Sequence, residues 1–505
     1  MVYRLLIVTF ALFFLLTSCT GLNQSDPTAI SSTVTPNQSA SPSLTPFRPS
    51  AYTSESTLPV STITSAISTE TLSTSFPISD VIPPRYILNA VLDYAAHSLT
   101  VDETIIYQNS TGQALNELVL AVEPNLWAGC FILGTVMVND QGITGMELNG
   151  DQLEIPLSPP LFFGEEIHIS LHYDLHLPPA DIHQVFGYNN LQINLVDWFP
   201  FVVPYSDGWV LHPPAEVGEH LTYDLADFDV KLSLADPELQ VILAVSSPSE
   251  AADGSWHYLL ENARTFAISA STAYQSTSAV VGGVTVMSYY YQNDKVEANA
   301  VLDETAKALT TFGKLFGSYP FSSLAIVESP YFDGMEYSGL FFLSRDYYHQ
   351  YDGTVLNYLV DIAVHETAHQ WWFGLVGNDQ ALEPWLDEAL ATYSENLFYE
   401  ENYPEVTSWW TFRVNAYSPT GWVDTDIYHA GKFRPYTNAA YFRGAQFLDA
   451  VRGRIGDEAF FAFLKDYAAQ MSGKLSTARN FFWILRQNTN VDISDLITGY
   501  FKNSH

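Results

Sequence analysis

The stretch HETAH at residues 365–369 decides the fold of this 505-residue chain. On an α-helix, positions i and i+4 lie one above the other on the same face. His365 and His369 can therefore both direct an imidazole at one metal ion. Glu366, one position along, reaches the open side of that ion, where a water molecule would bind. Two histidines and a carboxylate at this spacing are typical of a zinc-binding helix.

A second segment, WLDE at residues 385–388, supplies a third ligand. Glu388 follows His369 after eighteen intervening residues and falls in the second turn of a helix whose first turn includes Pro384. Three protein ligands that leave one position open indicate a catalytic rather than a structural zinc site. The alternative, two histidines on a polar helix face, does not explain this helix–loop–helix context. We expect one Zn²⁺ per chain, although cobalt or manganese could use the same ligands.

The beginning of the chain has the pattern of a targeting segment. Arg4 precedes an apolar run over residues 5–16, and small residues follow immediately before Cys19. This pattern resembles a bacterial lipoprotein signal, residues 1–18, after which Cys19 is lipidated; a cleaved secretory signal or a short uncleaved anchor is the alternative. The run is too short for a comfortable membrane span. We expect an extracytoplasmic protein that is lipid-anchored to a bacterial cell membrane.

Composition separates the next segment from the rest of the chain and limits the partners. Residues 19–84 are rich in Ser, Thr and Pro with almost no charge, so we expect a disordered linker. The chain carries 56 acidic and 20 basic side chains, which argues against nucleic-acid binding because that needs a basic surface. We infer no obligate protein partner. With Cys19 lipidated, only Cys130 is left, so we expect no intrachain disulfide and a buried thiol.

Two patterns divide the remaining chain into domains. Residues 85–291 contain runs of alternating apolar and polar residues, punctuated by Gly, Pro and Asn, which predict a β-rich domain with one buried face. His168, His172 and His176 fall on one strand face, with neighbours roughly 13 Å apart, so they cannot share a metal and indicate a solvated face. Residues 292–505 change to helical spacing, which predicts a mostly helical domain that contains the zinc ligands.

Together these motifs resemble those of the aminopeptidase N and leukotriene hydrolase family of zinc metallopeptidases, the gluzincins. In that family the two histidines and the later glutamate bind the zinc. The stretch DGMEY at residues 333–337 is similar to a family strand, Gly-x-Met-Glu-Asn, whose glutamate binds the α-amine of the substrate, and Glu336 occupies that place. The stretch YFRG at residues 441–444 is similar to Tyr-x-Lys-Gly, whose tyrosine, here Tyr441, faces the zinc.

The resemblance covers roughly residues 85–505 and implies an α+β fold. An antiparallel β-rich domain, a saddle or sandwich, would precede a mostly helical, thermolysin-like zinc peptidase domain. Asp333, Tyr337 and Arg443 depart from the family pattern. Tyr337 replaces an asparagine, which bears on the shape of the first substrate subsite and on strict exopeptidase action. The long helical C-terminal domain of larger members has no counterpart here, so we expect a compact member with a more open cleft.

The expected activity is that of an aminopeptidase, which removes N-terminal residues from peptides by zinc-hydroxide attack. Glu366 would act as the general base that takes the proton of the water and passes it to the leaving amine. The hydroxyl of Tyr441 would donate to the oxyanion, and Glu336 would pair with the protonated α-amine. The alternatives are a solvated loop acid at position 336 and an ordinary core tyrosine at position 441.

For several further residues, the sequence gives weaker evidence of a role in the site. Glu395, on the same predicted helix as the third ligand, either orients a ligand histidine or is exposed. Asp387 and Trp372 are expected to be structural, and Gln192 is a further candidate for amine binding. Two alternative functions stay open: endopeptidase or esterase-like action on the same zinc site, and a catalytically inactive envelope binding protein. An inactive binding protein would not need a general base beside the metal, so Glu366 argues against that alternative.

Overall fold

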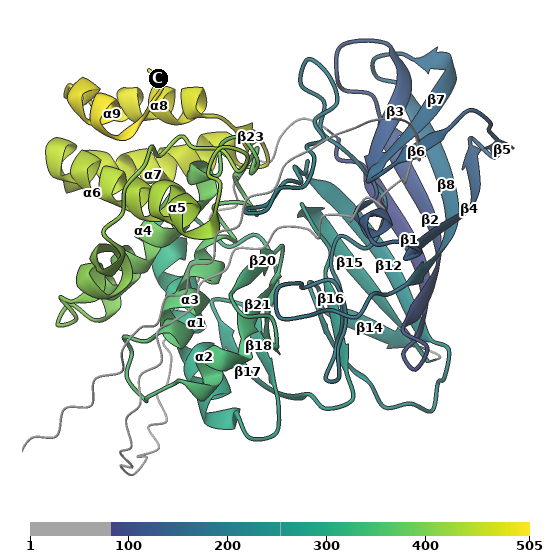
Figure 1. The fold of residues 1–505 in the computed structure, drawn as a ribbon, viewed down its shortest axis with the longest axis horizontal. Helices are drawn as coiled ribbons and strands as arrows, with labels where there is room; N and C mark the ends of the chain where they lie inside the picture. Colours follow the sequence, from purple (N-terminus) through teal and green to yellow (C-terminus); the bar gives the residue numbers. More distant parts are fainter. Residues whose placement is uncertain (1–81, 253, 505) are drawn as a thin grey trace, which may run out of the picture. The chain divides into compact units, whose positions relative to one another are not determined.

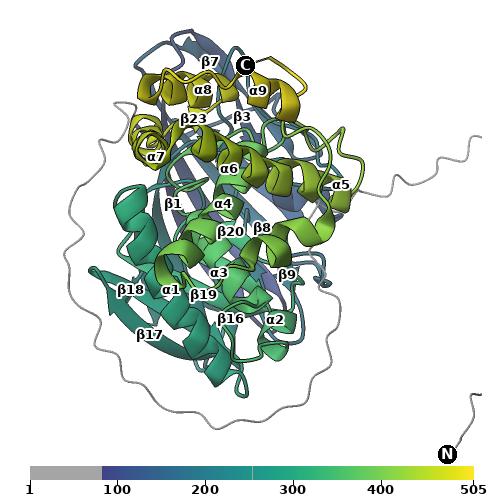
Figure 2. The same ribbon diagram turned by 90° about the vertical axis from the view of Figure 1, so that its left-hand side faces the viewer.

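The computed structural model describes residues 82–252 and 254–504. Figure 1 shows strands in the first part of this region and a predominance of helices in the second, and Figure 2 gives the perpendicular view. The predicted α+β fold class is confirmed. The domain limits inferred from the sequence stay a prediction.

The N-terminal expectations fall outside the described residues. The signal peptide over residues 1–18, the lipidated Cys19 and nearly all of the linker over residues 19–84 precede Ile82, where the description begins. Within the described residues, every helix is too short or too polar to cross a membrane.

Three sheets form the β-rich part in the described region. The largest has the strand order β14-β15-β12-β1-β2-β8-β4-β5 and is antiparallel except where β1 pairs with β12. Its strands are β1 (Arg85–Asp93), β2 (Ser98–Gln108), β4 (Phe131–Val138), β5 (Gln141–Gly142), β8 (Glu166–His176), β12 (Ala226–Leu234), β14 (Ser249–Ala252) and β15 (Ser255–Ala263).

The other two sheets have the orders β11-β3-β7-β6 and β13-β16-β10-β9. The first contains β3 (Leu115–Ala121), β6 (Glu147–Asn149), β7 (Gln152–Leu161) and β11 (Phe201–Val202). The second contains β9 (Gly187–Tyr188), β10 (Ile193–Leu195), β13 (Ile242–Val245) and β16 (Ile268–Ser271). A short 3₁₀ helix, η1 (Glu123–Leu126), follows β3.

Alternating side chains account for the large sheet. In β2 and β8 every second residue is buried, and Ile105 pairs with Ile169 across the two strands. The opposite face is polar, because His168 and His172 are about half exposed there and pair with acidic neighbours. The predicted solvated face is confirmed. Cys130 is buried and free, as expected, and burial raises the pKa of its thiol to about 12.

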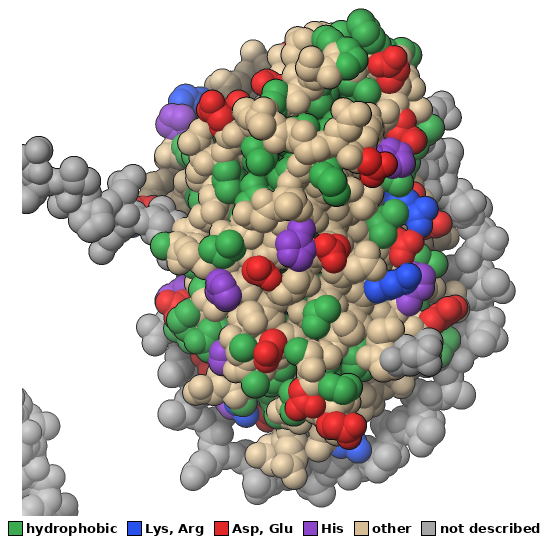
Figure 3. All heavy atoms as spheres, turned by 90° about the vertical axis from the view of Figure 1, so that its right-hand side faces the viewer, with side chains coloured by type: hydrophobic (Ala, Val, Ile, Leu, Met, Phe, Trp, Pro, Cys, Tyr) green, Lys and Arg blue, Asp and Glu red, His purple; other side chains and the backbone are tan. Residues whose placement is uncertain are grey.

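Figure 3 shows one face of the molecule, on which acidic side chains are dispersed among polar and apolar ones. No single basic area dominates this view. The strongly negative balance of the composition is therefore spread over this surface.

A five-stranded sheet leads into the helical part of the described region. Its order is β17-β18-β19-β21-β20, and α1 (Lys295–Leu315) packs against β17 and β18. The strands are β17 (Gln275–Val281), β18 (Val284–Tyr290), β19 (Ser323–Ser329), β20 (Met335–Tyr337) and β21 (Leu340–Ser344). A parallel pair, β22 (Gly377–Asn378) with β23 (Leu475–Ser476), lies further along the chain.

Two contacting helices, α3 (Tyr358–Ala368) and α4 (Trp385–Asn402), carry the metal-binding motifs. The side chain of Asn357 caps α3 by accepting from the amide of Val360. All residues of α3 after the first are buried, so this helix is enclosed on every side. The remaining helices are α2 (Arg345–His349), α5 (Phe433–Thr437), α6 (Gly444–Ile455), α7 (Asp457–Met471), α8 (Ala478–Asn488), α9 (Ser494–Tyr500), η2 (Trp410–Val414), η3 (Asn415–Tyr417) and η4 (Asn438–Arg443).

Candidate metal centre

The three predicted ligands meet between α3 and α4. His365 Nε2 lies 3.0 Å from His369 Nε2 and 3.3 Å from Glu388 Oε2, and His369 Nε2 lies 3.4 Å from that same oxygen. Ligand atoms about 2.0–2.1 Å from a tetrahedral Zn²⁺ would be separated by about 3.3 Å. All three side chains are buried. The donor set therefore has the spacing of ligands around one common ion.

The hydrogen bonds of the two imidazoles test whether a cation belongs between them. His369 Nδ1 lies 2.9 Å from the carbonyl oxygen of Trp372, which can only accept, so this nitrogen donates. His365 Nδ1 lies 2.7 Å from a carboxylate oxygen of Glu395 and donates in the same way. In the neutral rings, both Nε2 atoms then present lone pairs to each other. A metal ion removes that repulsion, so these residues fit Zn²⁺.

Glu388 completes the charge of the site. Burial alone would raise the pKa of its carboxyl, but without a metal the protonated rings of His369 and His365 hold that pKa below its ordinary value, so the carboxyl is ionised. An ionised carboxylate with two neutral imidazoles would leave a bound Zn²⁺ with a net charge of +1. A site of this charge retains the ability to polarise a carbonyl or a water molecule.

Glu395 is the residue behind the first ligand. Its side chain is completely buried, so the alternative that it is exposed is wrong. Arg413 Nε lies 2.8 Å from Glu395 Oε2, and Arg413 Nη2 lies 2.9 Å from Oε1. Burial alone would raise the pKa of Glu395, but Arg413 and His365 hold it below its ordinary value. Glu395 is thus placed to set the tautomer and the ring orientation of His365.

Arg413 extends this chain of contacts beyond Glu395. Its Nε also lies 3.0 Å from Asp361 Oδ2, on the same helix as the histidine ligands. Trp409 Nε1 donates to the other oxygen of Asp361 at 2.9 Å. The guanidinium therefore bridges two buried carboxylates, one from α3 and one from α4. The sequence analysis missed Arg413, because a lone arginine in an irregular segment carries no motif.

Glu366 lies beside the three ligands, where a general base is needed. It lines a cavity of about 30 Å³ together with the three ligands, Glu336 and Tyr441. This volume has room for a water molecule. Within the described residues, Glu366 Oε2 has no hydrogen-bond partner. Burial and the neighbouring carboxylate of Glu336 hold the pKa of Glu366 well above its usual range.

Glu336 enters the same cavity from β20. Gln380 Nε2 lies 3.3 Å from its Oε1 and is a donor to it, and the side chain is 5% exposed. Burial raises the pKa of this carboxyl, although His369 lowers it. A buried carboxylate at the edge of the ligand set is able to pair with a protonated amine. The alternative of a solvated loop acid does not hold.

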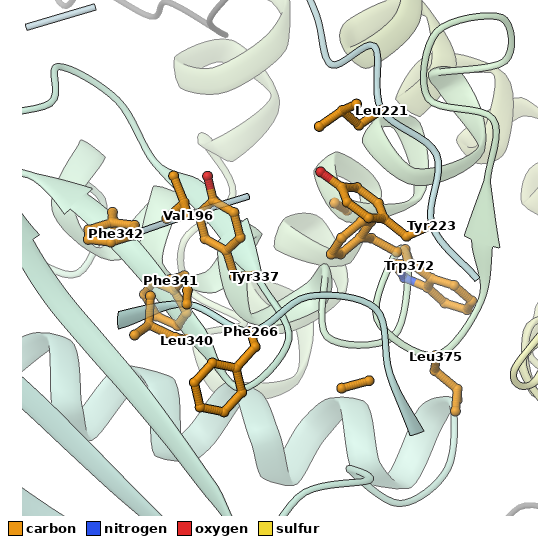
Figure 4. Packing of buried hydrophobic residues seen from close by; sticks show 14 of the residues in the cluster. Val196, Leu221, Tyr223, Phe266, Tyr337, Leu340, Phe341, Phe342, Trp372 and Leu375 are labelled. Carbon is orange, nitrogen blue, oxygen red and sulfur yellow. The ribbon is translucent and has the colours of Figure 1, made fainter. Parts of the chain in front are cut away.

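The side chains of Met335 and Tyr337, on either side of Glu336, point to the opposite face of β20. This corrects the expectation that Tyr337 affects the shape of the first substrate subsite. Successive side chains of a strand alternate in direction, and Met335 and Tyr337 line a second cavity of about 70 Å³ rather than the ligand cavity. Figure 4 shows the buried side chains of Val196, Tyr223 and Tyr337, which line this second cavity. The tyrosine that replaces the family's asparagine therefore does not project into the space beside the ligands.

Tyr441 lies in η4, a π-helical turn, and its ring stacks on that of His365 with centroids 6.0 Å apart. Its hydroxyl donates to Glu388 Oε1, the carboxylate oxygen that faces away from the two imidazoles. Burial raises the pKa of this phenol well above its ordinary value, and Glu388 adds to the effect. Tyr441 is therefore neutral, with its hydroxyl beside the ligand set rather than in an unrelated part of the core.

A further buried carboxylate, Glu219, comes from the loop before β12 and lines the second cavity rather than the cavity of the ligands. Glu219 Oε1 is buried and lacks a hydrogen-bond partner among the described residues. Burial, together with the carboxylates of Glu336 and Glu388, raises the pKa of Glu219 well above its usual range. The sequence analysis missed it because the segment has no periodicity. Gln192 is not the counterpart: it is fully buried, donates to Asn194 and is absent from the lining of the ligand cavity.

The two residues that were expected to be structural have structural surroundings. Trp372 Nε1 donates to Ser394 Oγ at 3.0 Å, and its ring is fully buried. Asp387 Oδ1 accepts from the amide of Glu388 at 2.8 Å. Both therefore support the helix and the loop that hold the ligands, and the carbonyl of Trp372 also orients His369 directly.

Comparison with known proteins gives partial matches to peptidases. Residues 300–500 match the model of the peptidase family M1 domain. Aminopeptidase M1-B of Oryza sativa subsp. japonica is 26% identical over 237 residues, which are 44% of this chain and 27% of that protein. Aminopeptidase N of Streptomyces lividans is 26% identical over 193 residues, 34% of this chain and 22% of that protein. The chain thus spans about a quarter of the length of these relatives.

Solved structures give a match over most of the described chain. The M1 zinc metallopeptidase of Deinococcus radiodurans has a TM-score of 0.61 at 18% identity, covering 84% of this chain and 94% of that one. A mutant of the same enzyme bound to a Tyr-Ser-Ala substrate has a TM-score of 0.63, covering 84% and 95%. At this identity the similarity shows the fold, which is that of a two-domain M1 peptidase.

Proposed function

We propose that this chain, which matches the peptidase family M1 domain over residues 300–500, is a zinc-dependent aminopeptidase that releases N-terminal residues from peptides. The observation that carries the proposal is the convergence of His365, His369 and Glu388 with three further carboxylates in one buried cavity. The two Nε2 atoms, 3.0 Å apart, have the spacing of two ligands around one cation. Retention of both a ligand set and a carboxylate general base argues against an inactive binding protein.

The roles of the protein groups follow from their positions. Zn²⁺ held by these ligands would polarise the scissile carbonyl and lower the pKa of a water molecule. Glu366, with one oxygen unpaired in the cavity, would accept the proton of that water and return it to the leaving amine. The hydroxyl of Tyr441 would supply a hydrogen bond as negative charge develops on the carbonyl oxygen.

Removal of single terminal residues, rather than cleavage within a chain, is supported by the carboxylate of Glu336. This side chain lines the cavity of the ligands and interacts electrostatically with Glu388. A protonated α-amine would pair with it and fix which bond reaches the metal. Tyr337 points away from this cavity, so the main sequence argument for endopeptidase action is not supported.

The activity is tested by hydrolysis of a panel of aminoacyl-anilides by the full chain, with and without a chelator. We expect hydrolysis that the chelator abolishes and that added Zn²⁺ restores. Free and N-acetylated forms of one peptide then separate the two modes of cleavage. The free peptide should lose residues from its N-terminus while the acetylated peptide stays intact. Equal cleavage of both at internal bonds would instead establish an endopeptidase.

We infer that the substrates are peptides, since the structure of a similar M1 enzyme was solved with a Tyr-Ser-Ala substrate bound. We further propose that the protein is lipidated on Cys19 and lies outside the cytoplasm on a bacterial membrane. The sequence pattern before Cys19 supports this. Labelling of cells with radioactive palmitate should mark the wild-type protein and leave Cys19→Ser unlabelled. Label on the variant would contradict the proposal.

A further inference from the structure

A second set of metal-type donors converges in the β-rich part of the molecule. Glu123 belongs to η1, Asp151 lies in the turn between β6 and β7, and His220 lies in the loop between β11 and β12. His220 Nε2 is 3.2 Å from Glu123 Oε2 and 3.6 Å from Asp151 Oδ2. One ligand atom from each of the three lies within 4.8 Å of the others. This spacing is close to that of the catalytic ligands.

The three donors are buried and poorly satisfied by one another. The side chains of His220, Glu123 and Asp151 are 5%, 7% and 13% exposed. Within the described residues, none of the three facing atoms has an aligned hydrogen-bond partner. Two carboxylates and an imidazole taken out of water in this way cost free energy unless a further group binds them.

The surroundings leave space for such a group. Glu123 and His220 line the second cavity of about 70 Å³, into which Asp197 also projects. A cavity of this size has room for a cation together with water molecules. The position is separate from the catalytic site, because none of these three residues lines the cavity of the zinc ligands.

We propose that Glu123, Asp151 and His220 bind a second divalent transition-metal cation, of the class of Mn²⁺ or Zn²⁺. Two carboxylates neutralise the dication. One imidazole nitrogen with carboxylate oxygens suits first-row transition metals, whereas Ca²⁺ and Mg²⁺ prefer oxygen ligands alone. Three protein ligands leave further coordination positions open toward the cavity, where water can complete the shell.

Such an ion would join three segments that no disulfide connects, since the one cysteine of the described region is free. It would also hold the loop that carries Glu219, the residue next to His220, whose side chain lines the same second cavity. Gly218, one residue earlier, has a φ of +74°, and a Cβ there would collide with Ile427 and the hydroxyl of Tyr436. The loop is therefore closely fitted on both sides, and the cation would fix its end.

The metal content of the full-length protein tests this proposal. Protein is stripped with a chelator, loaded with Mn²⁺ or Zn²⁺, freed of excess ion and measured by elemental analysis. We expect two ions per chain in the wild type and one in His369→Ala, which lacks a catalytic ligand. The double variant Glu123→Gln with His220→Asn should also hold one ion and keep the catalytic one. His212→Asn is the matched control: His212 lies in the same loop and pairs with Asp379 instead, so it should hold two.

The metal content would also show clearly if the second site does not exist. A protonated His220 that bridges the two carboxylates without a metal would give one ion in the wild type and none in His369→Ala, and this would overturn the proposal. If the double variant does not fold, the His369→Ala protein decides alone. Bound Mn²⁺ in its electron paramagnetic resonance spectrum supports the second site, and a spectrum of free Mn²⁺ only rejects it.

Discussion

His365 Nδ1 lies 2.7 Å from Glu395 Oε1, and this contact links a metal ligand to a fully buried ion-pair network. The carboxylate of Glu395 is itself held by Arg413 through two hydrogen bonds. The imidazole therefore has one tautomer and one orientation, with Nε2 free for the metal. Pre-organisation of this kind lowers the cost of ordering the ligands when the ion binds.

Glu395→Gln should weaken zinc binding about 10–100-fold, the usual effect of losing a group that orients a ligand. The amide lacks the charge that Arg413 and His365 require, so the ring of His365 loses its fixed position. Competition with a chromophoric chelator measures the affinity. Glu400→Gln is the matched control, because Glu400 lies near the end of the same helix and is 45% exposed. Equal affinity in the two variants would show that Glu395 has no positioning role.

Glu366→Gln should retain zinc and lose turnover. The amide keeps the shape of the side chain but cannot accept the proton of the attacking water, so kcat should fall about 10²–10⁴-fold. Steady-state hydrolysis of an aminoacyl-anilide measures the rate, and elemental analysis confirms that the metal is present. Full activity in a zinc-loaded variant would remove Glu366 from the mechanism.

Glu336→Ala should raise KM for substrates with a free α-amine roughly 10–100-fold, because a charge-assisted hydrogen bond to the ammonium group is lost. The kinetic constants of free and N-acetylated peptides, measured side by side, test this. We expect the large effect on the free peptide and little effect on any residual cleavage of the acetylated one. An unchanged ratio between the two peptides would assign the amine to another group.

Tyr441→Phe should lower kcat about 10²–10³-fold if its hydroxyl stabilises the oxyanion. The structure offers a second route, since the hydroxyl donates to the metal ligand Glu388. The zinc content of the Tyr441→Phe variant distinguishes these two roles of the hydroxyl. A loss of rate at full zinc occupancy supports the oxyanion role, whereas a loss that merely follows the missing metal shows that Tyr441 acts through Glu388.

The cluster around His220 predicts a pH dependence of stability in metal-free protein. Burial alone would lower the pKa of His220, but Glu123 and Asp151 raise it to about 9, above the unfolded value of about 6.5. The protonated ring therefore contributes its full stability below pH about 6.5, and this contribution is lost as the pH rises through about 9. The change in the free energy of unfolding should be on the order of 3 kcal/mol.

Chemical denaturation of chelator-treated protein, from about pH 6 to about pH 10, measures how the free energy of unfolding changes with pH. Burial raises the pKa of Asp197 to about 7 and His220 lowers it, so Asp197 also titrates in this range and its share is measured with Asp197→Asn. The His220→Asn variant should show a flatter stability profile than the wild type. Parallel profiles would mean that His220 has the same pKa in the folded and unfolded states.

The zinc ligands could be identified from the sequence because they depend on local geometry. Helical spacing places His365 and His369 on one face whatever surrounds the helix. The period-two runs likewise identified the strands of the large sheet, since one buried face imposes alternation. Tyr337 shows the limit of a motif match, because the direction of its side chain depends on which face of β20 meets the ligand cavity.

The amino-acid sequence alone determined the metal-binding helix, the third ligand, the carboxylate of Glu366 beside them and the α+β class, because each depends on residue type at a given spacing. Only the tertiary structure brought Arg413 to Glu395, and Glu123 and Asp151 to His220. These groups come from segments far apart in the chain, and no periodicity links them. Their meeting is decided by the packing of sheets and helices, which sequence spacing does not encode.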